Sequence, residues 1–275
     1  MLVFPHIVKK IFGKFDYMNL IIYLCRMNIR EYEELIISEI NGVVGQIIND
    51  TPTLPISVKR GERVGDGISK YLENKFVEMT DEHIYFRDSI PSPEGKTKNP
   101  FDVETIFELG GRREKVWVDF KSINIENEDS NPDSGTPDKV LKLIKDGNFY
   151  LVYVLVYYRG VPGGLSFVEN GGSFVKSYFL KDISETMRIT PSNQIQVNGF
   201  SEPVYRSREE FLRFLLQKKI ESNERKLKKC ISELENLRSG NFKVDVSLDD
   251  LIGMNNIQEE YISIIDTPPA FGYGQ

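Results

Sequence analysis

Two stretches of the chain alternate apolar and polar residues with the period of a β-strand. Residues 115–121 are rich in β-branched and aromatic types, and the alternation puts Trp117, Asp119 and Lys121 on one face, with apolar side chains on the other. Residues 101–109 predict the preceding strand, and the Gly-Gly pair between the two stretches supplies the turn of a hairpin. The sequence therefore predicts two antiparallel strands that bring acidic residues together.

Helical spacing marks the segments on either side of this hairpin. We expect the fold to begin with a helix near Ile29, and a second helix to cover residues 66–79 with Glu73 at the edge of its apolar stripe. That stripe consists of Ile68, Tyr71, Leu72, Phe76 and Met79. After the hairpin, Thr136 is placed to cap a third helix, which Gly147 closes.

The next apolar stretch, residues 149–158, is nearly continuous, which predicts a central strand covered on both faces. Residues 165–168 and 174–180 predict further strands, arranged as a hairpin at the edge of the sheet. Ser207 opens a long helix with a capping box, and this helix runs to about Arg238. We expect its apolar face to pack on the chain's own core, with a pair of such helices as the alternative. That face is formed by Ile220, Asn223, Leu227, Cys230, Leu234 and Leu237.

Length and composition agree with a compact enzyme. The chain has 275 residues, 40% of them hydrophobic, which is enough for one elaborated domain. Cys25 and Cys230 lie far apart and without histidines at metal-ligand spacing, so neither a zinc site nor a disulfide framework is expected, and a reduced, cytoplasmic compartment is the simplest one. The apolar run 19–25 is too short to span a bilayer and lacks a signal-peptide cleavage site, so no membrane association is expected.

The ends of the chain differ from its centre. The N-terminal stretch is basic, and Met18 and Met27 are alternative starting points, so this stretch is either poorly ordered or an over-extended reading frame. The expected order is a 1–28 N-terminal extension, a 29–205 catalytic domain, a 206–240 long helix that packs on the core or dimerises, and a 241–275 acidic tail.

The chemistry is concentrated in the first hairpin. Pairing its strands brings Asp102 beside Asp119, and two close carboxylates repel each other unless a cation lies between them. Carboxylate oxygens are the ligands that a hard ion such as Mg²⁺ prefers. Lys121, on the same face as Asp119, is placed to orient or deprotonate a water, or to stabilise charge on a phosphate. The hairpin therefore predicts a metal-dependent phosphodiesterase site.

This pattern resembles the PD-(D/E)xK nuclease superfamily, and the arrangement of residues 66–158 looks most like a type II restriction endonuclease. The resemblance implies an α/β fold with a restriction-endonuclease-like core, in which helices flank a mixed central sheet. It also implies that Asp102 and Asp119 bind Mg²⁺ with the backbone carbonyl of Phe120, that Lys121 handles the attacking water, and that Glu73 assists. The motif departs from the family pattern in one respect, because Phe101 separates the usual proline, here at position 100, from the first acid.

Other polar residues are candidates for DNA contacts, with ordinary surface positions as the alternative. Gln194 and Gln196, together with Asn198, alternate along a polar segment, and their amides can pair with adenine edges. Arg159 and Lys176, together with Arg188, are candidates for contacts to phosphates. By contrast, the Pro-Asp pairs at 132–133 and 137–138 follow the Asp-x-Lys motif and predict turns and a helix start.

The resemblance therefore implies a site-specific endonuclease of a restriction-modification system that hydrolyses both strands of duplex DNA and leaves 5′-phosphate ends. A palindromic target implies a two-fold homodimer. The net charge of −6 disfavours non-specific coating of DNA but is compatible with a local basic cleft. Two alternatives remain: another nuclease of the superfamily, acting in repair, junction resolution or transposition, and a non-cleaving DNA-binding protein.

Overall fold

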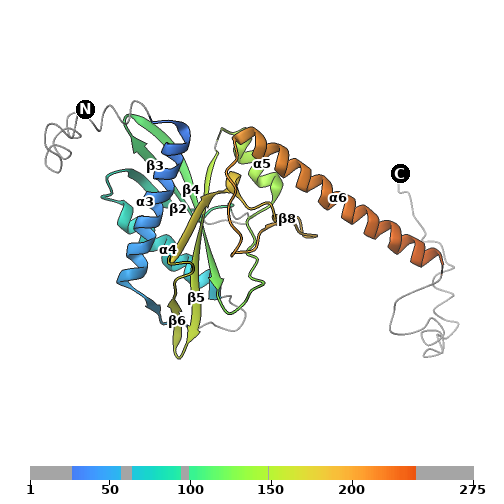
Figure 1. Cartoon of the computed structure of the whole chain (residues 1–275), viewed down its shortest axis with the longest axis horizontal. Coiled ribbons are helices and arrows are strands. Elements are labelled where there is room, and N and C mark those ends of the chain that lie inside the picture. Colours follow the sequence, from blue (N-terminus) through green and yellow to red (C-terminus); the bar gives the residue numbers. More distant parts are fainter. Residues whose placement is uncertain (1–26, 57–63, 94–98, 148, 240–275) are drawn as a thin grey trace, which may run out of the picture. The chain divides into compact units, whose positions relative to one another are not determined.

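The structure of the chain, a computed structural model, describes residues 27–56, 64–93, 99–147 and 149–239 (Figure 1). The expectations for the N-terminal extension, the apolar run 19–25 with Cys25, and the acidic tail concern residues outside these ranges. The chain divides into two compact units, residues 1–222 and 223–275. The first unit contains the whole sheet, and the described part of the second is the C-terminal half of the last helix.

The elements follow one another in the mixed order that the sequence predicts. The described helices are α3 (Ile29–Asp50), α4 (Val64–Thr80), α5 (Pro137–Lys145), α6 (Arg208–Arg238) and the short 3₁₀-helix η1 (Leu180–Asp182). The main strands are β2 (Phe86–Pro91), β3 (Val103–Leu109), β4 (Arg112–Asn124), β5 (Tyr150–Val161), β6 (Gly164–Phe167) and β7 (Val175–Phe179). Three two-residue strands complete the set: β1 (Thr53–Leu54), β8 (Arg188–Ile189) and β9 (Ile195–Gln196). None of the described helices has the length and apolar character needed to cross a membrane.

A mixed sheet forms the centre of the first unit. Its strand order in the described residues is β1-β6-β5-β4-β3-β2, and β7 pairs with β5 as well. Strands β3 and β4 are antiparallel, as predicted, and the turn between them uses Gly110 and Gly111 at positive φ. Strands β4 and β5 are parallel and are connected through α5. The long apolar strand 149–158 is therefore central, which confirms the prediction made from its continuous hydrophobicity.

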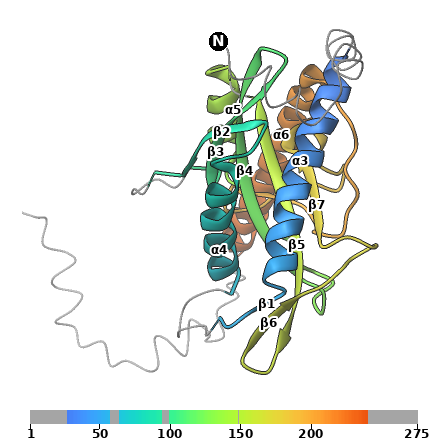
Figure 2. The same ribbon diagram turned by 90° about the vertical axis from the view of Figure 1, so that its left-hand side faces the viewer.

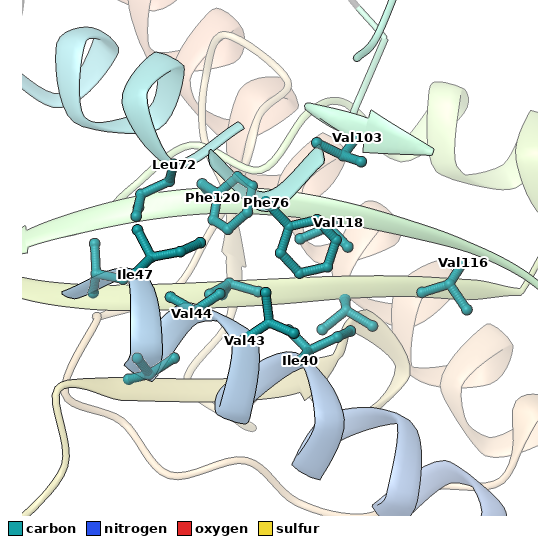
Figure 3. Close-up of a cluster of buried hydrophobic side chains, with 14 of the residues drawn as sticks. Ile40, Val43, Val44, Ile47, Leu72, Phe76, Val103, Val116, Val118 and Phe120 are labelled. Atoms are coloured by element: carbon teal, nitrogen blue, oxygen red, sulfur yellow. The ribbon is translucent and has the colours of Figure 1, made fainter. Parts of the chain in front are cut away.

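The two faces of the sheet have separate cores. On one face, α3 and α4 lie side by side against the strands (Figure 2). The core on this face contains the buried Val116, Val118 and Phe120 of β4 and the apolar stripes of both helices, with Leu72 and Phe76 from α4 (Figure 3). The opposite core contains Trp117 and Ile123 of β4 together with residues of α5, β8, β9 and the first turns of α6. The strand alternation predicted for residues 115–121 is thus confirmed.

Capping residues mark the starts of three helices. Asn28 caps α3 through a capping box with Glu31, and Thr136 caps α5 by accepting from the Lys139 N–H at 3.3 Å. In front of α6, the Ser207 N–H donates to Glu210 at 2.7 Å, and the Ser207 Oγ accepts from the Glu210 N–H at 3.2 Å. These short polar contacts satisfy N–H groups that the first turn of a helix leaves without partners.

The edge of the sheet beyond β5 differs from the expectation. Strands β6 and β7 do not pair with each other as a hairpin; both pair with β5, at successive places along it. Strand β5 is long enough to pair with both strands. Its residues Val152–Val156 pair with β7, and its residues Tyr158–Val161 pair with β6. The segment between β6 and β7 contains only an isolated bridge from Asn170 to Ser173.

Helix α6 leaves its second half exposed. Five apolar residues in positions 220–237 are exposed by 46 to 61%: Ile220, Leu227, Ile231, Leu234 and Leu237. By contrast, Phe211 and Leu215 in its first turns are fully buried in the core of the first unit. The start of the helix thus packs on the core of the first unit, and the packing or pairing expected for its later apolar face stays a prediction.

Candidate active site

The register of the first hairpin places the two predicted acids opposite each other. Val103 pairs with Val118, so Asp102, one residue before β3, lies opposite Asp119. The Asp102 N–H donates to the Val118 carbonyl at 2.8 Å, and the Phe120 N–H donates to Oδ2 of Asp102 at 2.8 Å. The backbone of β4 therefore fixes the position of the Asp102 carboxylate.

Asp119 and Lys121 form a nearly enclosed ion pair on the same face of β4. The Lys121 Nζ lies 2.8 Å from Oδ1 of Asp119, and the side chains are 20% and 6% exposed, respectively. Burial raises the pKa of Asp119 to about 7, the nearby Lys121 opposes this rise, and the charge of Asp102 adds to it. Burial acts to lower the pKa of Lys121, but the charges of Asp119, Asp102 and Asp133 outweigh it and raise this pKa.

This donor set fits a hard divalent cation. Asp119 is buried, and the negative charge of Asp102 helps to raise its pKa. A bound cation would offset the repulsion between these two carboxylates. The Phe120 carbonyl is placed to join the two acids, because the N–H and C=O of one strand residue point to the same side, here toward Asp102. The Ser69 hydroxyl of α4 donates to this carbonyl at 3.1 Å, which ties the helix to the site.

Glu73 lies on α4, one turn beyond Ser69, and only 8% of it is exposed. Its carboxylate is 2.7 Å from Nζ of Lys70. Within the described ranges, no three acidic, histidine or cysteine side chains are grouped closely enough to hold a metal ion. The structure therefore brings Asp102, Asp119 and Lys121 together. Glu73 instead pairs with Lys70, and it lies one helical turn from Ser69, which contacts the Phe120 carbonyl.

The candidate DNA contacts lie at different distances from this centre. Lys176 of β7 pairs with Leu155, which in turn pairs with Lys121, so both lysines lie in one row across the sheet, about 10 Å apart at ordinary strand spacing. Lys176 forms an ion pair with Glu202 at 2.7 Å. Arg159 is exposed near the end of β5, where it pairs with Ser166 of β6.

The polar segment after Asn193 alternates as expected, with Ile195 and Val197 buried and the residues between them partly exposed. Gln196 lies on β9 and borders a surface groove of about 520 Å³. Gln194 lies in the turn before β9 and does not line that groove. The two glutamines therefore have different surroundings.

Sequence reasoning missed the part played by residues 133–135. Asp133, interpreted as a turn residue, is one of the acids whose charge acts on Lys121. The adjacent Ser134 carbonyl accepts a hydrogen bond of 2.9 Å from the Tyr153 hydroxyl, and Tyr153 pairs with Asp119 across β4 and β5. No local sequence pattern predicts the contact between Ser134 and Tyr153, because it forms only when the loop after β4 folds back over the sheet.

Comparison with known proteins agrees with this geometry. The family model described as SwaI-like, SwaI restriction endonuclease, matches residues 28–237. No curated protein matches the chain. The matched region contains every described helix except the last residue of α6, and it includes the hairpin with both acids and the loop after β4. Since it covers well over half of the sequence, the chain belongs to the SwaI-like restriction endonuclease family.

Proposed function

We propose that this restriction endonuclease is a type II enzyme that hydrolyses both strands of duplex DNA at a specific sequence, with Mg²⁺ as cofactor. The observation that carries the proposal is the juxtaposition of Asp102 with the buried Asp119–Lys121 pair across one hairpin. The family match supports a DNA substrate, and the site supplies the chemistry for phosphodiester hydrolysis.

Each site residue has a separate task in this reaction. Asp102, Asp119 and the Phe120 carbonyl would hold Mg²⁺, which supplies a Lewis acid for the phosphate and a more acidic water. Lys121 is held by Asp119 at 2.8 Å, and its ammonium orients the attacking water and stabilises charge on the phosphate. In-line attack by that water breaks the bond to the 3′-oxygen and leaves a 5′-phosphate and a 3′-hydroxyl.

Glu73 and Lys176 have supporting parts in the proposal. Glu73 assists through a water from its position on α4, which the Ser69 contact ties to the Phe120 carbonyl. Lys176 lies in the same row as Lys121 and contacts the DNA backbone, as does Arg159 at the exposed end of β5. Such contacts give affinity without reading sequence.

Digestion of plasmid DNA tests the proposal. With Mg²⁺ the purified protein is expected to convert a plasmid to discrete fragments, and chelation of the metal is expected to stop cutting because the carboxylates no longer share a cation. Gel electrophoresis measures the fragments, and sequencing of their ends gives the cut position and the 5′-phosphates. Nicks at structured DNA would favour a repair or junction nuclease, and binding without cutting with any divalent metal would contradict the enzyme assignment.

A two-fold homodimer is part of the proposal, because a palindromic duplex presents the same target once on each strand. The exposed apolar residues along α6 support association through this helix. Sedimentation of the purified protein is expected to give twice the 31.7 kDa mass of one chain. A species of single-chain mass, both free and on a short target duplex, would contradict the dimer.

Protection of the host's own DNA completes the proposed biological setting. A nuclease that cuts a short sequence damages any genome in which that sequence is unprotected. We therefore place the enzyme in a restriction-modification system, with a DNA methyltransferase that modifies the same target. Methylation of the cut sequence is expected to block digestion in the plasmid assay.

A further inference from the structure

A polar groove lies at the surface between the loop after β4 and the β8–β9 hairpin. Its volume is about 520 Å³. Amides, hydroxyls, a carboxylate and the guanidinium of Arg188 line it, with Val197 as the aliphatic member. Donors and acceptors of this kind match the pattern of groups on base edges in a DNA groove.

Two of the lining residues hold each other in a defined orientation. Arg188 and Gln196 pair across the β8–β9 hairpin, and Nη2 of Arg188 donates to Oε1 of Gln196 at 3.3 Å. The Nε2 of Gln196 donates to Oδ1 of Asp133 at 2.7 Å. Arginine pairs with guanine edges and glutamine with adenine edges through paired hydrogen bonds, so both side chains suit base contact.

Asn198 also borders the groove but has a different task. Its Nδ2 donates to the Glu128 carbonyl at 2.8 Å, and its Oδ1 accepts from the Phe200 N–H at 2.9 Å. Both ends of this amide bind backbone groups and so fasten the loop after β4 to the segment after β9. The Gln196 amide instead binds the side chains of Arg188 and Asp133, which can move, so base contact is assigned to Arg188 and Gln196.

Residues 133–135 connect this groove to the catalytic centre. On the groove side, Ser134 and Gly135 exchange backbone hydrogen bonds of 2.9 and 2.8 Å with Ile195, and Asp133 forms a bridge with Gln196. On the other side, the Ser134 carbonyl binds the hydroxyl of Tyr153, the neighbour of Asp119 on β5. Residues 133–135 therefore contact both the β9 strand that borders the groove and the Tyr153 side chain beside Asp119.

The same segment also reaches the first acid and the lysine. Gly135 adopts φ +79°, and a Cβ added there would lie 3.1 Å from Cβ of Pro100, two residues before Asp102. The negative charge of Asp133 acts on Lys121. A shift of this segment would therefore move Pro100, two residues before Asp102, and Tyr153, the β5 neighbour of Asp119.

We propose that Arg188 and Gln196 read a base edge of the DNA target, and that Asp133 is a positioning residue that transmits occupancy of the groove to Lys121. The proposal rests on the nuclease function proposed above. The Gln196 amide nitrogen carries two hydrogens, so Gln196 can bind a base while it still donates to Asp133. Movement of Gln196 onto the base then shifts Asp133 and residues 133–135, which Ser134 joins to Tyr153, the β5 neighbour of Asp119. Cutting is thereby coupled to recognition, because the lysine is correctly placed only over the right sequence.

The variants Gln196→Ala and Gln46→Ala test the base contact as a matched pair. Gln196→Ala is expected to cut the target about 10- to 100-fold more slowly and to lose preference at one base pair, because one set of paired hydrogen bonds to a base is lost. Gln46 is exposed on α3, on the other face of the sheet from β8 and β9, so the rate and sequence preference of Gln46→Ala are expected to stay within about twofold of wild type. Sequencing of cut ends from a random duplex library measures both.

The variants Asp133→Ala and Asp133→Asn test whether Asp133 positions Lys121 when the groove binds a base. Asp133→Ala is expected to lower kcat about 10- to 100-fold with little change in KM, because it acts through the placement of Lys121 and not on binding. Asp133→Asn keeps an oxygen that accepts from Gln196 and is expected to recover most of that loss. A role confined to folding would instead alter melting temperature and leave the rate per folded molecule unchanged.

The outcomes separate this inference from the proposed function. A wild-type protein that cuts no DNA would contradict the nuclease itself. If wild type gives discrete fragments while Gln196→Ala cuts the same sequence at the same rate, the base contact is wrong. If Asp133→Ala raises KM alone, or if Asp133→Asn is as slow as Asp133→Ala, the positioning role is wrong.

Discussion

Replacing Asp119 by asparagine will abolish DNA cutting without lowering the stability of the metal-free protein. In the proposed site Asp119 helps to hold the metal, so its loss is expected to reduce the cleavage rate by at least about 10³-fold. Stability is expected to behave differently, because burial raises the pKa of Asp119 to about 7 and its ionised form is therefore a cost to the fold. Plasmid cleavage and thermal unfolding without divalent ions measure the two effects.

The sign of the pH dependence follows from the direction of this shift. The folded-state pKa of Asp119 lies above the unfolded value of about 3.9, so the folded protein binds more protons between these two values. Ionisation of Asp119 therefore lowers the stability of the metal-free wild type as pH rises from about 4 to 7. The variant Asp119→Asn cannot ionise at this position, so it lacks this loss of stability. Calcium ions are expected to raise the melting temperature of wild type but not of Asp119→Asn, because binding to the folded state alone stabilises it.

Glu104→Gln is the matched control. Glu104 lies on the neighbouring strand and accepts hydrogen bonds from Lys115 and Trp117, each at 2.8 Å. Burial acts to raise its pKa, but these partners outweigh burial and lower it, so its charge stabilises the fold. Glu104→Gln is expected to keep cutting and to lose about 1 kcal/mol of stability at neutral pH. If Asp119→Asn behaved in the same way, Asp119 would be structural and the site assignment would be wrong.

The strands and their register could be predicted because the relevant signals are local. The alternation around Trp117 and Asp119, together with the glycine turn, is enough to place Asp102 opposite Asp119. The capping residues Thr136 and Ser207 similarly mark where their helices begin. In each case the residues that decide the structure lie within a few positions of one another.

The rest depends on contacts between distant segments. Asp133 lies after the motif, and only the folding of its loop against β9 and Tyr153 brings it near Lys121. The failed hairpin of β6 and β7 has the same origin, because the length of β5 offered both strands a better partner than each other. The positions of glycines and the alternation of apolar residues predict a strand, but they do not predict which neighbouring strand it will pair with.

Lys181 gives the largest expected effect on stability. It lies in η1, only 2% of it is exposed, and its Nζ is 3.0 Å from Glu33 of α3 and 2.9 Å from Asp182. It also donates to the Arg206 carbonyl at 2.9 Å and lies over the ring of Tyr205 at 4.2 Å. This one ammonium therefore links α3, η1 and the segment that leads into α6.

Lys181→Met is expected to cost about 3 to 5 kcal/mol of unfolding free energy at neutral pH, because it leaves buried carboxylates without their cation. Burial already raises the pKa of Glu33, and Lys181 opposes that rise, so removal of the lysine raises the pKa further. The protonated form of Glu33 avoids the cost, and the loss should therefore shrink as pH falls through this higher value. Chemical denaturation at a series of pH values measures the change.

Lys176→Met is the comparison that separates burial from ion pairing. Its Nζ lies 2.7 Å from Glu202, as short a contact as those of Lys181, but the Glu202 side chain is 78% exposed. An exposed pair of this kind contributes about 1 kcal/mol or less, because water replaces the lost partner. Equal losses in the two variants, or a loss in Lys181→Met that does not vary with pH, would contradict the role given to the buried carboxylates. A large, pH-dependent loss in Lys181→Met alone would show that η1 holds α3 and the start of α6 together through charge.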